Sequence, residues 1–515
     1  MGWLVALLAV EWIPICAAMG VRGRGANAAF FLVAFTIVFL IAGCSRVRAS
    51  LPRISAELES VRIGWAWFVA HVGALLIFLA LFFLVPTPTP IWTAALLLTS
   101  GIGAIALATF AFIPPATARQ LILSTGHSWV YALTGGAAAW RLVPFSSSFW
   151  DRNTSHGQVL TGVTFDFVHF LLRNVLPGAV VDDRAKLAIG TPRFTVQIAG
   201  SCSGFEGLGM VLVFGLFWLW FFRREIRFPQ ALLLLPAALL LMWFLNAVRI
   251  VVLILIGHFG APDIAILGFH SQAGWIAFSG VTLAYAGALQ HLRWFAKVDR
   301  QPPAVENRAA VYLAPFMAIL AASLLTRATS AGFEWLYPLR FVAGSCALWF
   351  LRRRYAALDW SLSWIGPVIG VAVFVLWISL ERFIHPATST AMPVALAGAS
   401  APIRTAWILI RVLAATVTVP IAEELAFRGF LLRRIRAEDF ETIPLMRFTW
   451  LALFVSSFAF GALHGSRWIA GTLAGLLYAF AAVRRGKLGD AVIAHATTNA
   501  ILAAYVLVYN QWQLW

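Results

Sequence analysis

Long apolar runs separated by short polar loops make up most of the chain. Most runs are about 17–25 residues long, the length that spans a bilayer as an α-helix. The pattern predicts membrane-spanning helices at residues 2–20, 28–45, 64–85, 92–114, 205–222, 230–257 and 272–290, and again at 309–327, 334–351, 361–380, 404–432, 446–464, 468–483 and 489–508. We therefore predict an all-α polytopic integral membrane protein.

Two polar segments interrupt this pattern. The first, residues 146–204, follows a weakly amphipathic region at 127–145 and holds one further apolar run at 159–176. It ends in residues 193–199, where apolar and polar residues alternate as in a short β-strand. The second, residues 291–308, is charged and contains proline, as domain boundaries often do. We predict two helical membrane domains, residues 1–295 and 309–515.

The composition supports a membrane protein. Of the 515 residues, 61% are apolar and 11% are charged, against about 25% charged in soluble proteins. The net charge is +17, but the basic residues lie in short loops between the apolar runs. That is the positive-inside pattern, which reports orientation in the bilayer. The chemistry therefore indicates membrane lipids as neighbours and no nucleic acid partner.

The basic loops predict on which side of the membrane a cluster of Cys202, Arg249 and His270 lies. Residues 223–227 and 291–300 are predicted to be cytoplasmic, so span 205–222 runs from the outside to the inside. Cys202 then lies at the outer face of the membrane. The next span returns outward, which places Arg249 in its outer half and His270 beside the outer loop. Three residues that are far apart in sequence are thus predicted to meet at one face.

A thiol, a guanidinium and an imidazole are the parts of a cysteine acyl-transfer site. A nearby cation such as Arg249 favours the thiolate form of Cys202 or neutralises an oxyanion. An arginine in hydrocarbon costs at least about 2.5–3.5 kcal/mol, so Arg249 should face a partner or a polar cavity. His270 is placed to protonate a leaving amine. The structural alternative is a small packing cysteine, a snorkelling arginine and a loop histidine.

These residues resemble the motifs of a known family. Ser201-Cys202-Ser203-Gly204, Asn246-x-x-Arg249 and His270 followed by Gly274-Trp275 are similar to the three motifs of the exosortases, bacterial membrane cysteine transpeptidases. The resemblance implies Cys202 as nucleophile, Arg249 as stabiliser of the thiolate or oxyanion, and His270 as acid and base. It also implies protein substrates with a C-terminal sorting signal made of a short motif, a transmembrane helix and a basic tail.

A second polar cluster lies in the last spans. Glu423 and Glu424 are adjacent inside an apolar run, where ionisable residues are usually functional. Glu424 and Arg428 are four residues apart, so they share a helix face and are predicted to pair. His464 and His495 lie in the two later motifs Phe460-x-x-x-His464 and His495-x-x-x-Asn499. The spacing of the last motif makes the His495 and Asn499 side chains project together.

A carboxylate and a histidine deprotonate water, and a histidine with an amide stabilises an oxyanion, so this set suffices for peptide hydrolysis. Two alternatives remain: polar pairs that only hold helices together, and a zinc site of one glutamate and two histidines. We favour no metal, since the chain lacks His-Glu-x-x-His, and we predict no cofactor.

The motifs Glu-Glu-x-x-x-Arg, Phe-x-x-x-His and His-x-x-x-Asn resemble the CPBP family, which holds the CAAX endopeptidases and bacteriocin-processing membrane proteases. The resemblance implies a metal-independent glutamate-type intramembrane protease over about residues 309–515. Glu423 and His464 would activate water, His495 and Asn499 would form the oxyanion site, and Glu424 and Arg428 would support them.

Together the two halves resemble the fused exosortase–protease proteins of the VPEID-CTERM sorting system. The resemblance implies a multi-pass protein of the bacterial inner membrane, with the cysteine site on the periplasmic side. Transport or scaffolding is the competing class, because buried carboxylates with histidines also relay protons. The halves show no related repeat with paired broken helices, which secondary transporters usually have. A second alternative is that one half only docks substrates.

Overall fold

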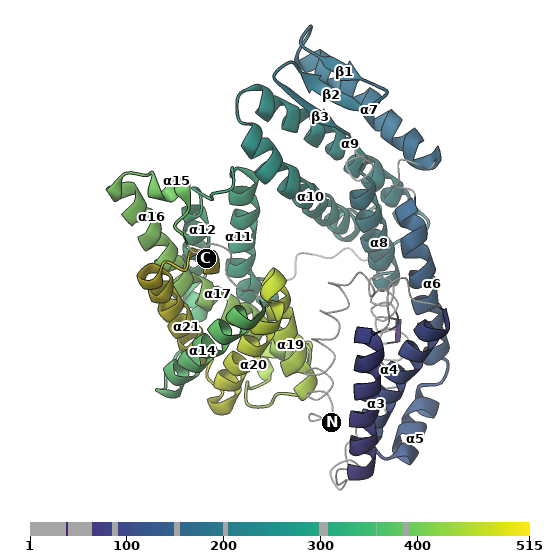
Figure 1. Cartoon of the computed structure of the whole chain (residues 1–515), viewed down its shortest axis with the longest axis vertical. Helices are drawn as coiled ribbons and strands as arrows, with labels where there is room; N and C mark the ends of the chain where they lie inside the picture. The colour runs from purple at the N-terminus through teal and green to yellow at the C-terminus, as the bar shows by residue number, and fades with distance from the viewer. Residues whose placement is uncertain are drawn as a thin grey trace. The chain divides into compact units, whose positions relative to one another are not determined.

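The computed structural model describes residues 35, 38–39, 64–84, 91–148, 155–198, 204–297, 307–356, 358–384 and 391–515. Contacts between Cα atoms divide the chain into two compact units, residues 1–151 and 152–515, whose helices are labelled in Figure 1. Over the described ranges, eight helices are long and apolar enough to cross a membrane, or nine if one bent pair counts as a single span. The predicted all-α membrane fold is confirmed.

Among its described residues, the first unit contains four helices. They are α3 (Trp65–Leu84), α4 (Ile91–Phe112), α5 (Pro115–Thr125) and α6 (Ser128–Ser148). The pairing of α3 with α4 includes a polar contact inside the bundle, where fully buried His71 places Nδ1 2.9 Å from the carbonyl oxygen of Ala104. The predicted spans 64–85 and 92–114 are confirmed as helices. The predicted spans 2–20 and 28–45 lie outside the described residues, apart from Phe35, Val38 and Phe39.

The second unit begins with a small sheet set between helices (Figure 1). Its first elements are α7 (Ser155–Val175), β1 (Val181–Asp183), β2 (Ala188–Thr191), β3 (Phe194–Gln197), α8 (Phe205–Phe221), α9 (Gln230–His258), η2 (Ile264–Phe269) and α10 (His270–His291). The strands are antiparallel in the order β1-β2-β3, with Ile189 opposite Val196. The alternation at 193–199 thus correctly predicted β3, whereas β1 and β2 were not predicted.

The apolar face of the sheet packs on α9. Ile189 and Ile198 are buried in one cluster with Ile250 and Ile254 of that helix. The ring of Phe194 lies so close to Gly257 that a Cβ there would stand 2.3 Å from it. A glycine is therefore required at this crossing, and it holds the end of β3 against the helix.

Helices α8, α9 and α10 form a second packed cluster. Buried side chains from all three helices meet there, among them Val211, Leu235 and Tyr285. Small residues on α8 allow a close approach, since a Cβ at Gly207 would lie 2.4 Å from Met242 Cε. Small residues at helix crossings are the usual means of association in membranes, where burial of apolar surface gives little gain.

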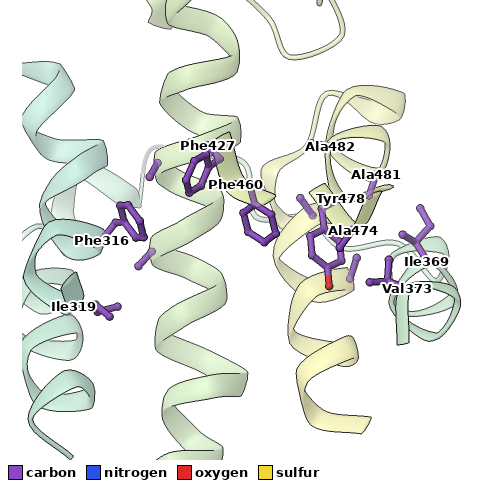
Figure 2. Packing of buried hydrophobic residues seen from close by; sticks show 14 residues of the cluster. Phe316, Ile319, Ile369, Val373, Phe427, Phe460, Ala474, Tyr478, Ala481 and Ala482 are labelled. Atoms are coloured by element: carbon purple, nitrogen blue, oxygen red, sulfur yellow. The ribbon is translucent and has the colours of Figure 1, made fainter. Parts of the chain in front are cut away.

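The rest of the unit is helical. Its elements are α11 (Arg308–Ala328), α12 (Pro338–Phe350), α13 (Arg352–Tyr355), α14 (Ile365–Ile384), α15 (Val394–Ala397), α16 (Ala401–Leu413), η3 (Ala414–Thr418), α17 (Val419–Glu424), η4 (Leu425–Leu431), α18 (Leu432–Arg434), η5 (Phe440–Thr442), α19 (Trp450–Ala462), η6 (Gly465–Arg467), α20 (Trp468–Arg485), α21 (Leu488–Tyr509) and η7 (Trp512–Leu514). Residues Ala401–Arg434 form one helical stretch of 34 residues. Figure 2 shows its Phe427 near Phe460 and Phe316 in a shared core.

Three predicted spans form shorter helices than expected. Span 205–222 is a helix of 17 residues, and spans 334–351 and 446–464 contain helices of 13 residues. A helix of 13 residues is about 20 Å long, less than the roughly 30 Å of a hydrocarbon core. The last one ends at Ala462, and Gly465, with φ 59°, lies in the turn that follows. This end places His464 in a turn rather than within the helix.

Candidate active sites

The first candidate site is arranged around α9. Its Asn246 is buried and lies against Gly204, where a Cβ would stand 3.0 Å from Nδ2 of the asparagine. Gly204 also has φ 98°, a conformation that favours glycine. Two constraints thus fix a glycine directly before α8. Ser201, Cys202 and Ser203 precede it in the sequence and lie outside the described residues.

Arg249 and His270 line one pocket of about 190 Å³. Arg249 is one turn beyond Asn246 on α9, and its Nη1 atom lies 3.1 Å from where a Cβ on Gly274 would stand. His270 is the first residue of α10, four residues before Gly274 and therefore on the same helix face. Strand β3 borders the pocket through Val196 and Gln197. Two of the three residues predicted for this site are brought together, and the third lies outside the described residues.

The second candidate site is a buried polar cluster between α17, η4, α20 and α21. The Glu424 and Arg428 side chains are fully buried, and Nη1 of the arginine donates to Oε1 of the glutamate at 3.1 Å. The same oxygen lies 3.0 Å from Nδ1 of His495. Nη2 of Arg428 donates to the carbonyl oxygen of Gly475 at 2.7 Å. The predicted pair of Glu424 and Arg428 is confirmed, and it anchors a histidine.

His495 lies between the two adjacent carboxylates. Its Nδ1 faces Glu424, and its Nε2 lies 3.9 Å from Oε2 of Glu423. The Tyr478 ring stacks on the imidazole at 4.7 Å between centroids, with 16° between the planes. Glu423 keeps a small accessible area, since its side chain is 16% exposed whereas that of Glu424 is 0% exposed. Of the two carboxylates, only that of Glu423 is therefore accessible from outside the cluster.

His464 has its tautomer fixed by the backbone. Its Nδ1 lies 2.9 Å from the carbonyl oxygen of Phe460. A carbonyl oxygen only accepts hydrogen bonds, so Nδ1 carries the proton and the neutral ring keeps its lone pair on Nε2. The ring packs edge-on against Trp377 at 5.5 Å, and a Cβ on Gly471 would lie 3.0 Å from Nδ1. The imidazole is thus held with its basic nitrogen away from the helix end.

Phe460 links the two histidines. Its ring centroid lies 4.8 Å from that of His464 and 5.6 Å from that of His495. The Arg428 guanidinium lies over the same ring at 4.7 Å. In the described part of the chain, no hydrogen bond or ion pair joins His464 to Glu423. Asn499 donates from Nδ2 to the carbonyl oxygen of Ala415 at 2.8 Å, so it faces the same helical stretch as His495.

π-Helical segments adjoin the candidate residues of both sites. The segment η2 ends one residue before His270, and η3 and η4 flank the short α17 that carries Glu423 and Glu424. Arg428 lies within η4. Such segments are rare and are frequently found at functional sites, because the extra residue in the turn re-aims side chains. No pattern of residues predicted these segments.

An ion pair that was not predicted from the sequence lies beside His464. The buried carboxylate of Glu381 accepts two hydrogen bonds from Arg467, at 2.9 and 2.7 Å. Arg467 directly follows the turn that begins at His464, and its backbone N–H donates to the His464 carbonyl oxygen at 3.1 Å. Glu381 lies one residue beyond the predicted span 361–380. The feature of the sequence that could have predicted this ion pair is an acidic residue, Glu381, directly after an apolar span.

Acids, imidazoles and a guanidinium are gathered on helices that are long and apolar enough to cross a membrane, an arrangement that suits a helical membrane peptidase. Two family models match the sequence: transmembrane exosortase (Exosortase_EpsH) over residues 24–287, and type II CAAX prenyl endopeptidase Rce1-like over residues 405–501. The first match covers more than half of the chain, so the protein belongs to the transmembrane exosortase family, with a C-terminal domain like the CAAX proteases. No curated protein and no solved structure matches.

The two families make this chain a membrane enzyme that processes proteins. The exosortase match implies protein substrates with C-terminal sorting signals. The residues of the first candidate site fall within the first match, and those of the second fall within the other. Across the described residues, no group of three or more His, Cys, Asp or Glu side chains is close enough to hold a metal ion.

A substitution at Gly274 tests the Arg249 pocket. Even the Cβ of a new side chain would lie 3.1 Å from Nη1, so Gly274→Val is expected to displace the guanidinium. A misplacement of about 1 Å costs up to about 100-fold in rate, and we expect cleavage of a sorting-signal substrate to fall about 10- to 100-fold. The control is Gly280→Val on the same helix, where a Cβ meets nothing within 4 Å. Equal losses in both variants would contradict a role for this contact.

Proposed function

We propose that the chain cleaves proteins at a C-terminal sorting signal through Cys202, Arg249 and His270, and hydrolyses a peptide bond in the membrane through Glu423 and His464. The two activities belong to domains 1–295 and 309–515. The observation that carries the proposal is the pocket shared by Arg249 and His270. The two family matches, each of which contains the motifs of one site, support it. We place the protein in the bacterial inner membrane, with this pocket on the periplasmic side.

At the first site, the Cys202 thiolate attacks the carbonyl carbon of the scissile peptide bond. Arg249 offers guanidinium hydrogens to the oxyanion of the tetrahedral intermediate. The C–N bond breaks, His270 gives a proton to the leaving amine, and a thioester remains on Cys202. An acceptor amine or water then attacks the thioester and restores the thiol. The C-terminal fragment of the sorting signal, with its transmembrane helix and basic tail, is the leaving group.

At the second site, water attacks a peptide carbonyl. Glu423, whose carboxylate is partly exposed, accepts one proton of the water. Nε2 of His464 accepts a hydrogen bond from the other hydrogen and so orients the water, because its Nδ1 is committed to a backbone oxygen. His495 and Asn499 stabilise the oxyanion, with His495 oriented by Glu424 and Arg428. The proton passes to the leaving amine as the C–N bond breaks. No metal takes part in this proposal.

The test of the first site uses a membrane-anchored reporter that ends in a short motif, one apolar helix and a basic tail. The full-length protein should cleave it. Arg249→Lys keeps the charge but lacks the planar fork of donors, and we expect the cleavage rate to fall about 100-fold or more, the effect of removing an oxyanion donor. Arg224→Lys in the exposed basic loop is the matched control. Near-normal turnover by Arg249→Lys would show that only the positive charge of this residue is needed, which contradicts a role for its planar donors.

A further inference from the structure

Beside the first candidate site, one edge of the small sheet has no further strand among the described residues. Within the described chain, β3 pairs with β2 alone. Its burial alternates: Phe194 and Val196 are half-buried toward α9, whereas Thr195 and Gln197 are exposed. A sheet edge presents unpaired backbone groups, which attract another chain. Lipid cannot satisfy such groups, so this edge must contact water or a polypeptide.

The register shows which backbone groups point outward. Ile198 donates its N–H to the Leu187 carbonyl oxygen at 2.8 Å. Antiparallel pairs alternate between hydrogen-bonded and non-hydrogen-bonded positions, so the pair of Ile189 and Val196 is hydrogen-bonded too. The residues between them, Thr195 and Gln197, therefore direct their backbone N–H and C=O groups away from β2.

This open edge borders the pocket that holds Arg249 and His270. Gln197 lines the pocket directly, and Leu253 of α9 and Ile266 of η2 give it an apolar floor and wall. A peptide lying along β3 would therefore have its backbone on Gln197 and its next carbonyl near the guanidinium. The contacts with alternating backbone groups fix the register of such a peptide, and register decides which bond meets the reactive groups.

We propose that β3 binds the substrate segment next to the scissile bond as an added β-strand, through the backbone N–H and C=O groups of Thr195 and Gln197. This inference rests on the proposed cleavage of C-terminal sorting signals. In this proposal, β3 recognises the backbone of the substrate segment. The enzyme then selects substrate side chains only at the positions where they enter the pocket.

The first test is Gln197→Pro in the full-length protein. Proline removes the outward N–H, and an edge strand tolerates it because that group makes no bond to β2. We expect kcat/KM for the reporter to fall about 3- to 10-fold below that of Gln197→Ala, since one net hydrogen bond is lost. Gln197→Ala is the comparator because it keeps the N–H and loses the same side chain.

Asp182→Pro provides the matched control on the far edge. Residues Val181 and Asp183 face Gly190 and Ala188 of β2, so Asp182 directs its backbone outward, away from the pocket. Asp182→Pro should cleave the reporter at close to the wild-type rate. Equal kcat/KM for Gln197→Pro and Gln197→Ala would overturn the proposal.

A second measurement does not depend on folding of the proline variant. Successive backbone amides of the substrate segment are replaced by esters, which lack the N–H. We expect cleavage by the wild-type protein to fall at every second position, because strand contacts have a period of two. Losses without this period, or no losses, would overturn strand addition. Failure of the wild-type protein to cleave the unmodified reporter would instead refute the proposed function.

Discussion

Cys202→Ser is expected to abolish cleavage of the sorting-signal reporter, with a rate loss of at least about 1,000-fold. Serine preserves the size of the side chain, but its hydroxyl is a far weaker acid than a thiol and supplies almost no anionic nucleophile. A neighbouring guanidinium stabilises a thiolate but does not remove the proton of an alcohol. The measurement is the rate at which the reporter loses its C-terminal fragment in membranes that contain the full-length protein.

The control for this experiment is Cys346→Ser, because Cys346 is a free and exposed cysteine in the other half of the chain. It should leave cleavage unchanged and exclude a general effect of losing a thiol. Hydroxylamine, which cleaves thioesters, should release reporter from the wild-type protein and none from Cys202→Ser. Unchanged turnover by Cys202→Ser would rule out the cysteine mechanism.

Glu423→Gln is expected to remove the peptidase activity of the C-terminal domain and to leave sorting-signal cleavage intact. The amide keeps the shape of the carboxylate but cannot accept a proton from water, and loss of a general base typically costs about 100- to 10,000-fold. The substitution should leave the packing of the helix intact, because glutamine has the size of glutamate and the Glu423 side chain is 16% exposed. The measurement is hydrolysis of a labelled membrane peptide by the full-length protein in lipid.

Glu438→Gln is the matched control, because the Glu438 side chain is 94% exposed on a loop. Treatment with EDTA should leave hydrolysis unchanged. If EDTA inhibits hydrolysis and added zinc reverses the inhibition, the site binds zinc and the metal-independent mechanism is wrong. Full activity of Glu423→Gln would move the base to another residue of the cluster, with Glu424 excluded by its complete burial.

The sequence predicts best what depends on neighbours along the chain. Helices follow from apolar runs, and the pair of Glu424 and Arg428 follows from four-residue spacing on one helix. The alternation of residues 193–199 correctly indicated β3. Strands β1 and β2, with the sequences Val-Asp-Asp and Ala-Ile-Gly-Thr, show no such alternation of apolar and polar residues, so no pattern marked them as strands.

What the sequence could not predict depends on contacts between helices. Residue spacing predicts that Glu423 and Glu424 point in different directions, but not that His495 lies between them. The stacking of Tyr478 on His495 and the packing of Trp377 on His464 join residues that are distant in sequence. The proposed domain boundary near residues 291–308 stays a prediction, because part of that segment lies outside the described residues.

The buried pair of Glu424 and Arg428 has a consequence for biogenesis. An isolated carboxylate or guanidinium would oppose transfer of this helix from the translocation channel into lipid. The two groups are carried by one helix, four residues apart, and meet at 3.1 Å, so their pairing needs no other helix. The pair thus lowers the cost of placing this helix in lipid, whereas Glu423 gains its contact with His495 only from the last helix.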